Sequence, residues 1–368
     1  MTRTLLMTGA TGALGVPLLV ELLRASEFGR VIVLVRGEPA SLRAALLRES
    51  PGLDLGALNP LTAELGSASA PAALATLAKV DCVIHAAACT KFRASLAQLT
   101  TANVEGTRQI LAWAAAQRLP PRVLHFSTTC VAGQRTGEIA ESPLPEEAGF
   151  VNDYERTKWQ AEQLVAASPL RPEIIRLATV IGSARDGHLQ RPGAFHTTLR
   201  WLHAGLLPMV PGDESTRLDL LPTELLTGFV PRLLAHAPEP GGLYHVSCGA
   251  HGLPLGELLN FVAQKFATRN AAWRSGQILA PVLATRAAFE DFRASIVKSR
   301  DFLFNQVFES VDSFLPELFY PKHYATARAE GVWGGPWPRP DWREWIGKVV
   351  DYALDTDFGR QETPLHPR

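Results

Sequence analysis

Short apolar runs alternate with amphipathic stretches along the first half of the chain. Residues 31–35 are all apolar and mostly β-branched, which is typical of a parallel strand covered on both faces. Residues 14–23 carry the apolar spacing of a helix, and Pro17 is compatible with it because a proline near the first turn costs little. Further strands are predicted at 4–8, 81–85, 123–126 and 173–177, and further helices at 102–117 and 154–167.

This alternation of strand and helix predicts an α/β protein with a Rossmann-type, doubly wound parallel sheet and right-handed crossovers. We expect residues 1–182 to form the dinucleotide-binding domain, with 219–248 returning to it through a strand at 243–247. Residues 249–368 are expected to form a smaller, mostly helical substrate-binding lobe, to which 183–218 contribute.

The apolar stretches of the last third leave three interpretations open. Residues 255–266 and 302–315 are rich in Phe, Leu and Val. They could wall a tunnel for an acyl chain, form a lid, or simply pack as core, which is the commoner use of an amphipathic face. A last helix is predicted at 342–354, and the tail at 359–368 is expected to fray.

A glycine-rich turn, Gly9-Ala-Thr-Gly12-Ala-Leu-Gly15, follows the first predicted strand. In a dinucleotide site the first glycine permits the tight turn, the second lets the backbone approach a pyrophosphate, and the third lets the next helix pack on the sheet. The phosphates then lie at a helix N-terminus, which favours an anion. The alternative is a tight connection without a ligand. The cofactor-binding residues expected in this turn are Gly9, Thr11, Gly12, Ala13, Leu14 and Gly15.

Arg36 ends the second predicted strand, 21 positions after Gly15. An NAD-specific site usually has Asp or Glu there to bind the ribose 2′-OH, whereas an arginine accommodates the 2′-phosphate of NADP. Arg36 therefore favours NADPH, with Arg43 as a second phosphate contact, whereas Glu38 argues against it. A solvated arginine at a strand end is the alternative.

Small residues follow the predicted strand at 81–85. Ala86, Ala87 and Ala88 would let a cofactor lie close to the backbone, or they pack as core. Histidines in these apolar strands are expected to be buried and satisfied by neighbours rather than to act as bases. They are His85, His125 and His245.

Tyr154 and Lys158 lie four residues apart in a predicted helix and so project from one face. A phenol has an ordinary pKa of about 10, and we expect the ammonium group to stabilise the phenolate and lower that pKa. Thr128 would hydrogen-bond the same substrate oxygen. A lone Tyr-x-x-x-Lys pair is common on exposed helices, but after a dinucleotide turn it favours catalysis by Thr128, Tyr154 and Lys158.

Composition narrows the class of protein further. The 368 residues include 36 basic and 36 acidic side chains, so no electrostatic footprint for nucleic acid or an anionic membrane is present. The four cysteines are scattered without metal or disulfide spacing, so we expect no metal site. No apolar run reaches 18 residues and no signal peptide is evident, which favours the cytoplasm.

Several motifs together resemble the extended short-chain dehydrogenase/reductase superfamily. The most similar branch is that of male-sterility-type fatty acyl-CoA reductases and the terminal thioester reductase domains of carboxylic acid reductases and peptide synthetases. The resemblance covers roughly the first 250 residues. Its carriers are Thr8-Gly-Ala-Thr-Gly-Ala-Leu-Gly15, Leu34-Val-Arg-Gly37, His85-Ala-Ala-Ala88, Asn103-Val-Glu-Gly-Thr107, His125-Phe-Ser-Thr-Thr-Cys-Val-Ala-Gly133 and Gly149-Phe-Val-Asn-Asp-Tyr-Glu-Arg-Thr-Lys-Trp-Gln-Ala-Glu162.

The resemblance implies a catalytic triad of Thr128, Tyr154 and Lys158, with Lys158 also binding the cofactor ribose. Where relatives often have Gly-Asp-Leu, this chain has Ala63-Glu-Leu65, which implies that Glu64 and Leu65 lie near the adenine. The predicted strand at 173–177 is followed by Ala178 and Thr179, and it lacks the proline that many relatives have after the arginine. The resemblance implies that Leu177 and Thr179 there contact the cofactor.

By this resemblance the protein is an NADPH-dependent reductase of an acyl thioester, on CoA or a carrier protein, to the aldehyde or alcohol. The alternative is a dehydrogenase, epimerase or dehydratase that acts on a ketone, hydroxyl, sterol or nucleotide sugar. A cofactor-sensing protein without catalysis is a third, weaker alternative, because Tyr154 and Lys158 are both present.

Overall fold

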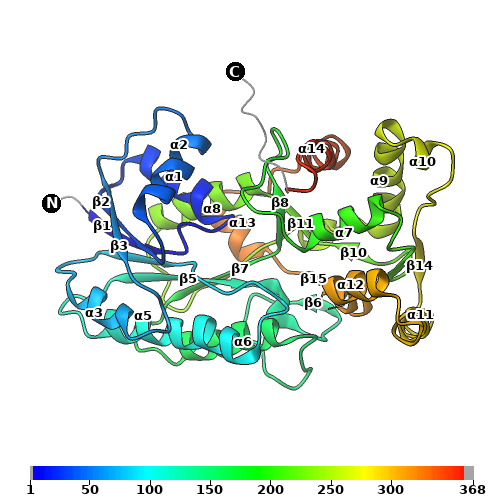
Figure 1. Cartoon of the computed structure of the whole chain (residues 1–368). Coiled ribbons are helices and arrows are strands. Elements are labelled where there is room, and N and C mark those ends of the chain that lie inside the picture. The colour runs from blue at the N-terminus through cyan, green and yellow to red at the C-terminus, as the bar shows by residue number, and fades with distance from the viewer. Residues whose placement is uncertain (1–2, 313, 360–368) are drawn as a thin grey trace.

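A parallel sheet of seven strands forms the centre of the computed structural model, which describes residues 3–312 and 314–359 (Figure 1). The strand order is β12-β7-β5-β4-β1-β2-β3, and each neighbouring pair is parallel. This order confirms the predicted doubly wound sheet. The strands are β1 (Arg3–Thr8), β2 (Phe28–Val35), β3 (Leu58–Thr62), β4 (Cys82–His85), β5 (Arg122–Thr128), β7 (Glu173–Leu177) and β12 (Leu243–Val246).

Helices cover both faces of the sheet, as Figure 1 shows. The strands are mostly apolar because both faces of the sheet are covered; in β2, for example, the last five residues are all apolar and buried. One layer consists of α1 (Gly15–Ala25), α2 (Pro39–Glu49), α8 (Thr223–Ala235) and α13 (Ala327–Trp333). The other consists of α3 (Ser69–Ala75), α5 (Gly106–Ala115) and α6 (Asp153–Ala166).

The helix predicted at 102–117 begins differently from the prediction. A short helix α4 (Leu96–Leu99) leads into a π-helical segment η1 (Thr100–Glu105), and only then does α5 start at Gly106. A π turn widens the helix, and such turns are frequent at functional sites. Here it contains Asn103, whose side chain is buried and donates a hydrogen bond to Thr157 on α6.

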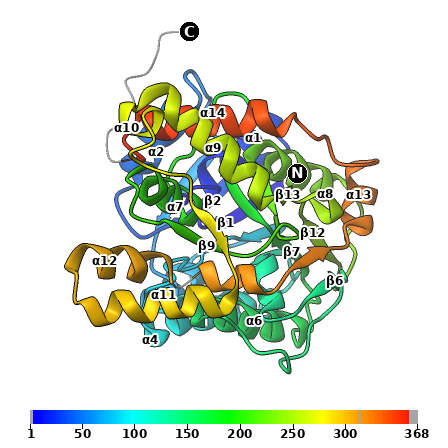
Figure 2. The ribbon, with the colours of Figure 1, turned by 90° about the vertical axis from the view of Figure 1, so that its right-hand side faces the viewer.

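A second apolar core is built by residues between 181 and 358, and the helices around it lie to the right of the sheet in Figure 1 and face the viewer in Figure 2. Phe266 and Phe308 are buried in it, as the packing alternative predicts. Its helices are α7 (Ala194–His203), α9 (Leu255–Arg269), α10 (Ala271–Arg274), α11 (Arg286–Ser299), α12 (Phe302–Val311) and α14 (Trp342–Asp355). Short strands accompany them: β8 (Thr179–Gly182), β9 (Met209–Pro211), β10 (Arg217–Leu218), β11 (Leu220–Pro222), β13 (Leu253–Pro254) and β14 (Val282–Ala284).

The C-terminal third also reaches back to the sheet. Strand β15 (Lys322–Tyr324) pairs with β6 (Gly137–Ile139), and α13 packs on β12. Three 3₁₀ turns complete the chain: η2 (Thr129–Ala132), η3 (Gly249–His251) and η4 (Leu315–Phe319). Our division into domains stays a prediction, and the predicted frayed tail lies outside the described residues beyond 359. Within the described ranges, no helix has both the length and the apolar character needed to cross a membrane.

Candidate active site

The glycine turn after β1 is packed so tightly that two of its glycines admit no side chain. Gly9 has φ +75°, and a Cβ there would lie 2.5 Å from the carbonyl carbon of Ala86. A Cβ on Gly15 would lie 2.0 Å from the carbonyl oxygen of Gly9. Real Cβ atoms do not approach backbone this closely, so glycine is required at both positions. The turn therefore lies against the first residues after β4.

The end of β4 is fixed to the glycine turn by a chain of buried hydrogen bonds. The Thr8 hydroxyl accepts from the Ala87 backbone N–H at 3.1 Å and lies 2.8 Å from His85 Nδ1. His85 Nε2 lies 3.0 Å from the Thr107 hydroxyl on α5. Burial lowers the pKa of His85 to about 3, so the ring is neutral. His85 is thus satisfied by its neighbours, as predicted.

The turn fits the pyrophosphate of a dinucleotide. Helix α1 starts at Gly15 without a side-chain cap from Leu14, and Thr11 is exposed at the outer edge of the turn. A helix N-terminus without a capping side chain favours an anion. Of the other predicted cofactor contacts, Gly12 and Ala13 are half-buried in the turn. The small Ala86, Ala87 and Ala88, all half-buried, face the same edge of the sheet.

Arg36 and Glu64 lie together at the ends of β2 and β3. The Arg36 guanidinium is 3.8 Å from the Glu64 carboxylate, and the two side chains are 75% and 60% exposed. Arg43 is exposed on α2, with its guanidinium 3.5 Å from the carbonyl oxygen of Leu58. Leu65 is half-buried and packs on the core below α3 and α5. The Arg36 guanidinium is therefore accessible to a phosphate, and the Glu64 carboxylate lies next to it.

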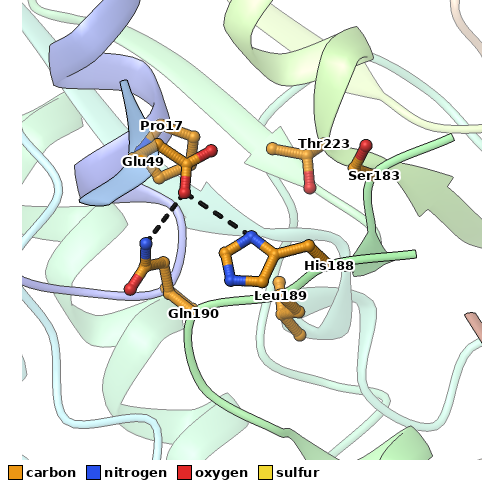
Figure 3. A pocket seen from close by; sticks show the side chains of 8 residues that line it. Pro17, Glu49, Ser183, His188, Leu189, Gln190 and Thr223 are labelled. Atoms are coloured by element: carbon orange, nitrogen blue, oxygen red, sulfur yellow. Dashed lines mark hydrogen bonds and ion pairs between the residues drawn. The ribbon is translucent and has the colours of Figure 1, made fainter. Parts of the chain in front are cut away.

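A small cavity beside the glycine turn is bordered by the loop of residues 183–190 (Figure 3). Its volume is about 20 Å³, room for about one water molecule, between Ala13 and Pro17 on one side and residues 183–190 on the other. The Glu49 carboxylate accepts from the Gln190 amide at 2.8 Å and lies 3.5 Å from His188 Nδ1. These contacts hold the loop over the N-terminal layer of helices.

The predicted catalytic residues Thr128, Tyr154 and Lys158 converge at the C-terminal end of β5. Tyr154 is 8% exposed and shares a side-chain hydrogen bond with Thr128. Lys158 is 4% exposed and donates to the carbonyl oxygen of Phe126 at 2.7 Å. Helix α6 starts here because the Asn152 side chain caps the N–H of Glu155. The Glu155 carboxylate in turn accepts from the Asn152 amide, so the start of the helix is held from both sides.

The predicted lowering of the Tyr154 pKa is wrong for this structure. Burial of the phenol raises the pKa of Tyr154, with further contributions from Cys130 and Glu155, whereas the bond to Thr128 lowers it. Lys158 points to the backbone of β5 instead, and burial lowers the pKa of its own ammonium group to about 8. The phenol therefore keeps its proton at neutral pH and is prepared to donate it.

Aromatic side chains from two segments cover Tyr154. The ring of Phe92, in the loop after β4, meets the Tyr154 ring edge-on at 5.1 Å. Phe314, which follows α12, lies 5.8 Å from Phe92. Beside them the guanidinium of Arg93 pairs with the Glu309 carboxylate at 2.9 Å. The loop after β4 and the end of helix α12 thus meet over Tyr154.

Sequence reasoning did not single out Asn103, which joins that loop to α6. Its side-chain oxygen accepts from the Cys89 N–H at 2.7 Å, and its amide donates to the Thr157 hydroxyl at 3.1 Å. The motif around Asn103 was noted, but its partners are distant in sequence. Asn103 thus joins the loop after β4 to helix α6.

A second missed group comes from the C-terminal third. The Cys130 thiol lies 3.8 Å from the Glu317 carboxylate, which lies 3.6 Å from the Lys322 ammonium group. Lys322 also donates to the Gly133 carbonyl, and the Tyr324 hydroxyl donates to the Thr129 carbonyl at 3.2 Å. Burial, together with the proximity of Glu317, raises the pKa of Glu155, the residue next to Tyr154. The segment 317–324 thus borders the site directly.

The remaining predicted residues lie as follows. Leu177 is buried at the end of β7, and Thr179 is exposed at the start of β8, where its N–H donates to the Asp219 carbonyl. His245 is satisfied by Ala325 and Arg176, as predicted. The same prediction is wrong for His125: both ring nitrogens lack a hydrogen-bond partner among the described residues, and its ring packs 5.3 Å from His85.

Comparison with known proteins extends this picture. The model of the family described as male sterility protein matches residues 7–229. The isonitrile lipopeptide synthase of Streptomyces coeruleorubidus is 29% identical over 57% of this chain, and the glycine betaine reductase of Emericella nidulans is 30% identical over 66%. The chain spans only 15% and 21% of the lengths of these two relatives.

Solved structures share the fold. The terminal R domain of the myxalamid PKS-NRPS pathway superposes with a TM-score of 0.76 at 23% identity, covering 99% of this chain and 93% of that one. A thiolation-reductase di-domain from an archaeal non-ribosomal peptide synthetase gives 0.72 at 20% identity, covering 98% and 77%. UDP-glucuronic acid 4-epimerase from Bacillus cereus, in complex with NAD, gives 0.65 at 18% identity, covering 95% and 96%.

Proposed function

Because the chain belongs to the male sterility protein family, we propose that it is an NADPH-dependent reductase of an acyl thioester. Family membership confirms the predicted enzyme class, an NAD(P)-dependent oxidoreductase of the extended short-chain type. The nicotinamide cofactor belongs to that class. The preference for the phosphorylated form, the thioester and its carrier are our proposals.

The observation that carries the proposal is the buried Tyr154 hydroxyl, hydrogen-bonded to Thr128 at the end of β5. A reduction needs an acid at the carbonyl oxygen, and a buried phenol with a raised pKa keeps its proton until negative charge develops beside it. Lys158 holds its ammonium group on the same helix face, where a ribose would lie one turn from the phenol. Thr128 and Tyr154 thus form a donor site for an oxyanion, and Lys158 lies one helical turn away from it.

The reaction consumes one hydride and one proton and releases aldehyde and thiol. The cofactor, when bound, supplies the hydride to the thioester carbon. Thr128 and Tyr154 hold the oxygen, and Tyr154 gives it a proton to form a hemithioacetal. The carbon–sulfur bond then breaks, the hydroxyl proton returns to Tyr154, and the thiolate takes a proton from solvent. A second hydride and proton would reduce the aldehyde to the alcohol.

Arg36 supports NADPH as the cofactor. Its exposed guanidinium lies at the end of β2, where the 2′-phosphate is read in this fold. The Glu64 carboxylate lies 3.8 Å from this guanidinium, and a bound phosphate would replace it as the partner of Arg36.

The thioester rather than a ketone is supported by the relatives. The most similar solved structures include a reductase joined to a thiolation domain, and the known relatives include peptide synthases. The second candidate is an epimerase or dehydrogenase of a nucleotide sugar, which the shared fold of UDP-glucuronic acid 4-epimerase favours.

Turnover of thioesters tests the proposal. We expect wild-type protein with NADPH to release free thiol and aldehyde from an acyl-CoA or an acyl-carrier thioester, and Tyr154→Phe to lose this activity while keeping fold and cofactor binding. Thiol is measured by a colorimetric reagent, aldehyde by trapping, and fold by circular dichroism. Turnover of a nucleotide sugar or ketone without thiol release from any thioester would establish the second candidate, and full activity of Tyr154→Phe would refute the role of the phenol.

A further inference from the structure

A cavity of about 320 Å³ lies between β10, the turn η3 and the segment before β15. Arg217, Ser215, Lys322 and His323 line it, together with the backbone of Gly249 and Gly252. It shares no residue with the glycine turn or with the Arg36 region, so it lies apart from the dinucleotide site. Three of its side chains are basic or can become so.

Among the charged side chains that line the cavity, the Arg217 guanidinium is the one available to bind an anion. Lys322 is paired with Glu317, and His323 lies 3.4 Å from the Glu138 carboxylate. Asp219, the one acidic side chain lining the cavity, accepts from the Ser247 hydroxyl at 2.6 Å and the Cys248 N–H at 2.7 Å. The Arg217 side chain is exposed and has no hydrogen-bond or ion-pair partner among the residues that the structure describes.

Successive contacts connect this cavity to the catalytic tyrosine. The ammonium group of Lys322, which lines the cavity, lies 3.6 Å from the Glu317 carboxylate. The same carboxylate lies 3.8 Å from the Cys130 thiol. The Cys130 N–H donates to the Thr128 hydroxyl at 3.2 Å, and Thr128 bonds to Tyr154. These contacts place the wall of the cavity only a few side chains away from the oxyanion site.

We propose that Arg217 and this cavity bind the phosphate of the phosphopantetheine arm that carries the thioester. The inference rests on the proposed function, because that arm is common to CoA and to carrier proteins. A planar guanidinium binds a phosphate through two parallel hydrogen bonds, and a single unpaired arginine matches the single phosphate of the arm. The thioester end then lies at Thr128 and Tyr154, while the phosphate end stays at the mouth of the cavity.

Two thioesters of the same acyl group test the site. One is carried on 4′-phosphopantetheine and the other on pantetheine, which lacks the phosphate. With wild-type protein, we expect the KM of the 4′-phosphopantetheine thioester to be about 10- to 100-fold lower than that of the pantetheine thioester, the range for one hydrogen-bonded charge. Arg217→Ala should remove this difference and leave kcat and KM for the pantetheine thioester unchanged. Arg108→Ala, at an exposed arginine on α5, is the control and should keep the full difference.

Calorimetric titration separates this site from the proposed function. Binding of 4′-phosphopantetheine, compared with pantetheine, needs no turnover, and we expect it to depend on Arg217. Binding that persists in Arg217→Ala, or a preference for UDP-glucose over 4′-phosphopantetheine, would overturn the inference even if thioesters are reduced. If phosphopantetheine binds through Arg217 and no thioester turns over, the site stands and the proposed reaction fails. Acyl-CoA and acyl-carrier protein, each assayed with Arg217→Ala, show which source of the arm the site serves.

Discussion

The buried ammonium group of Lys158 makes the stability of the protein depend on pH in a defined direction. Burial lowers the pKa of Lys158 from 10.5 to about 8 in the folded protein. Below pH 8 both the folded and the unfolded chain hold the proton, and the folded state bears the cost of the buried charge. Between pH 8 and 10.5 the unfolded chain binds more protons, so the free energy of unfolding rises with pH across this window.

The size of the effect follows from the two pKa values. A difference from 10.5 to about 8, at about 1.4 kcal/mol per pH unit, corresponds to about 3 kcal/mol. Lys158→Met removes the titrating group and keeps an unbranched apolar side chain of similar length. We therefore expect the variant to gain most over wild type at pH 7, and its advantage to shrink by about 3 kcal/mol as the pH rises through the window.

Urea unfolding without cofactor, followed by tryptophan fluorescence at several values between pH 7 and 10.5, measures this difference. All other titrating groups are shared by the two proteins, so they cancel when one free energy is subtracted from the other. Lys298→Met, at an exposed lysine on α11, is the matched control and should show no such change. Parallel curves for wild type and Lys158→Met would refute the argument that Lys158 is buried with its charge.

Two further changes test the cofactor site. Arg36→Ala should weaken NADPH binding about tenfold or more while NADH binding changes little, because only the phosphate is lost as a partner; fluorescence titration of both reduced cofactors decides this, and equal affinities in wild type would exclude a 2′-phosphate site. Gly15→Ala should abolish binding of both cofactors and lower the melting temperature, since its Cβ would lie 2.0 Å from the Gly9 carbonyl oxygen. The open Gly37, whose Cβ would meet nothing within 4 Å, provides Gly37→Ala as the control.

Local patterns in the sequence predicted the strands of the sheet, the glycine turn and the grouping of Thr128, Tyr154 and Lys158. Residues 31–35 are apolar and mostly β-branched, which favours a doubly covered strand, and the glycine turn directly follows a strand and precedes a helix. Tyr154 and Lys158 needed only the helix period to be placed on one face. Because the carboxyl ends of parallel strands meet at one edge, Thr128 could be assigned to the same site from its place after a strand.

Only the tertiary structure decided the electrostatics and the borders of the site. The fall of the Lys158 pKa, and the rise rather than fall of the Tyr154 pKa, depend on burial, which spacing along a helix does not reveal. The Cys130 thiol meets Glu317 across 187 positions of sequence, and Lys322 reaches Gly133 across 189. Such contacts leave no periodic signal, because the chain that joins them folds into a separate core before returning to the sheet. Arg217 likewise is a candidate phosphate-binding residue only because the fold places it in a cavity where Lys322 and His323 are already paired with carboxylates.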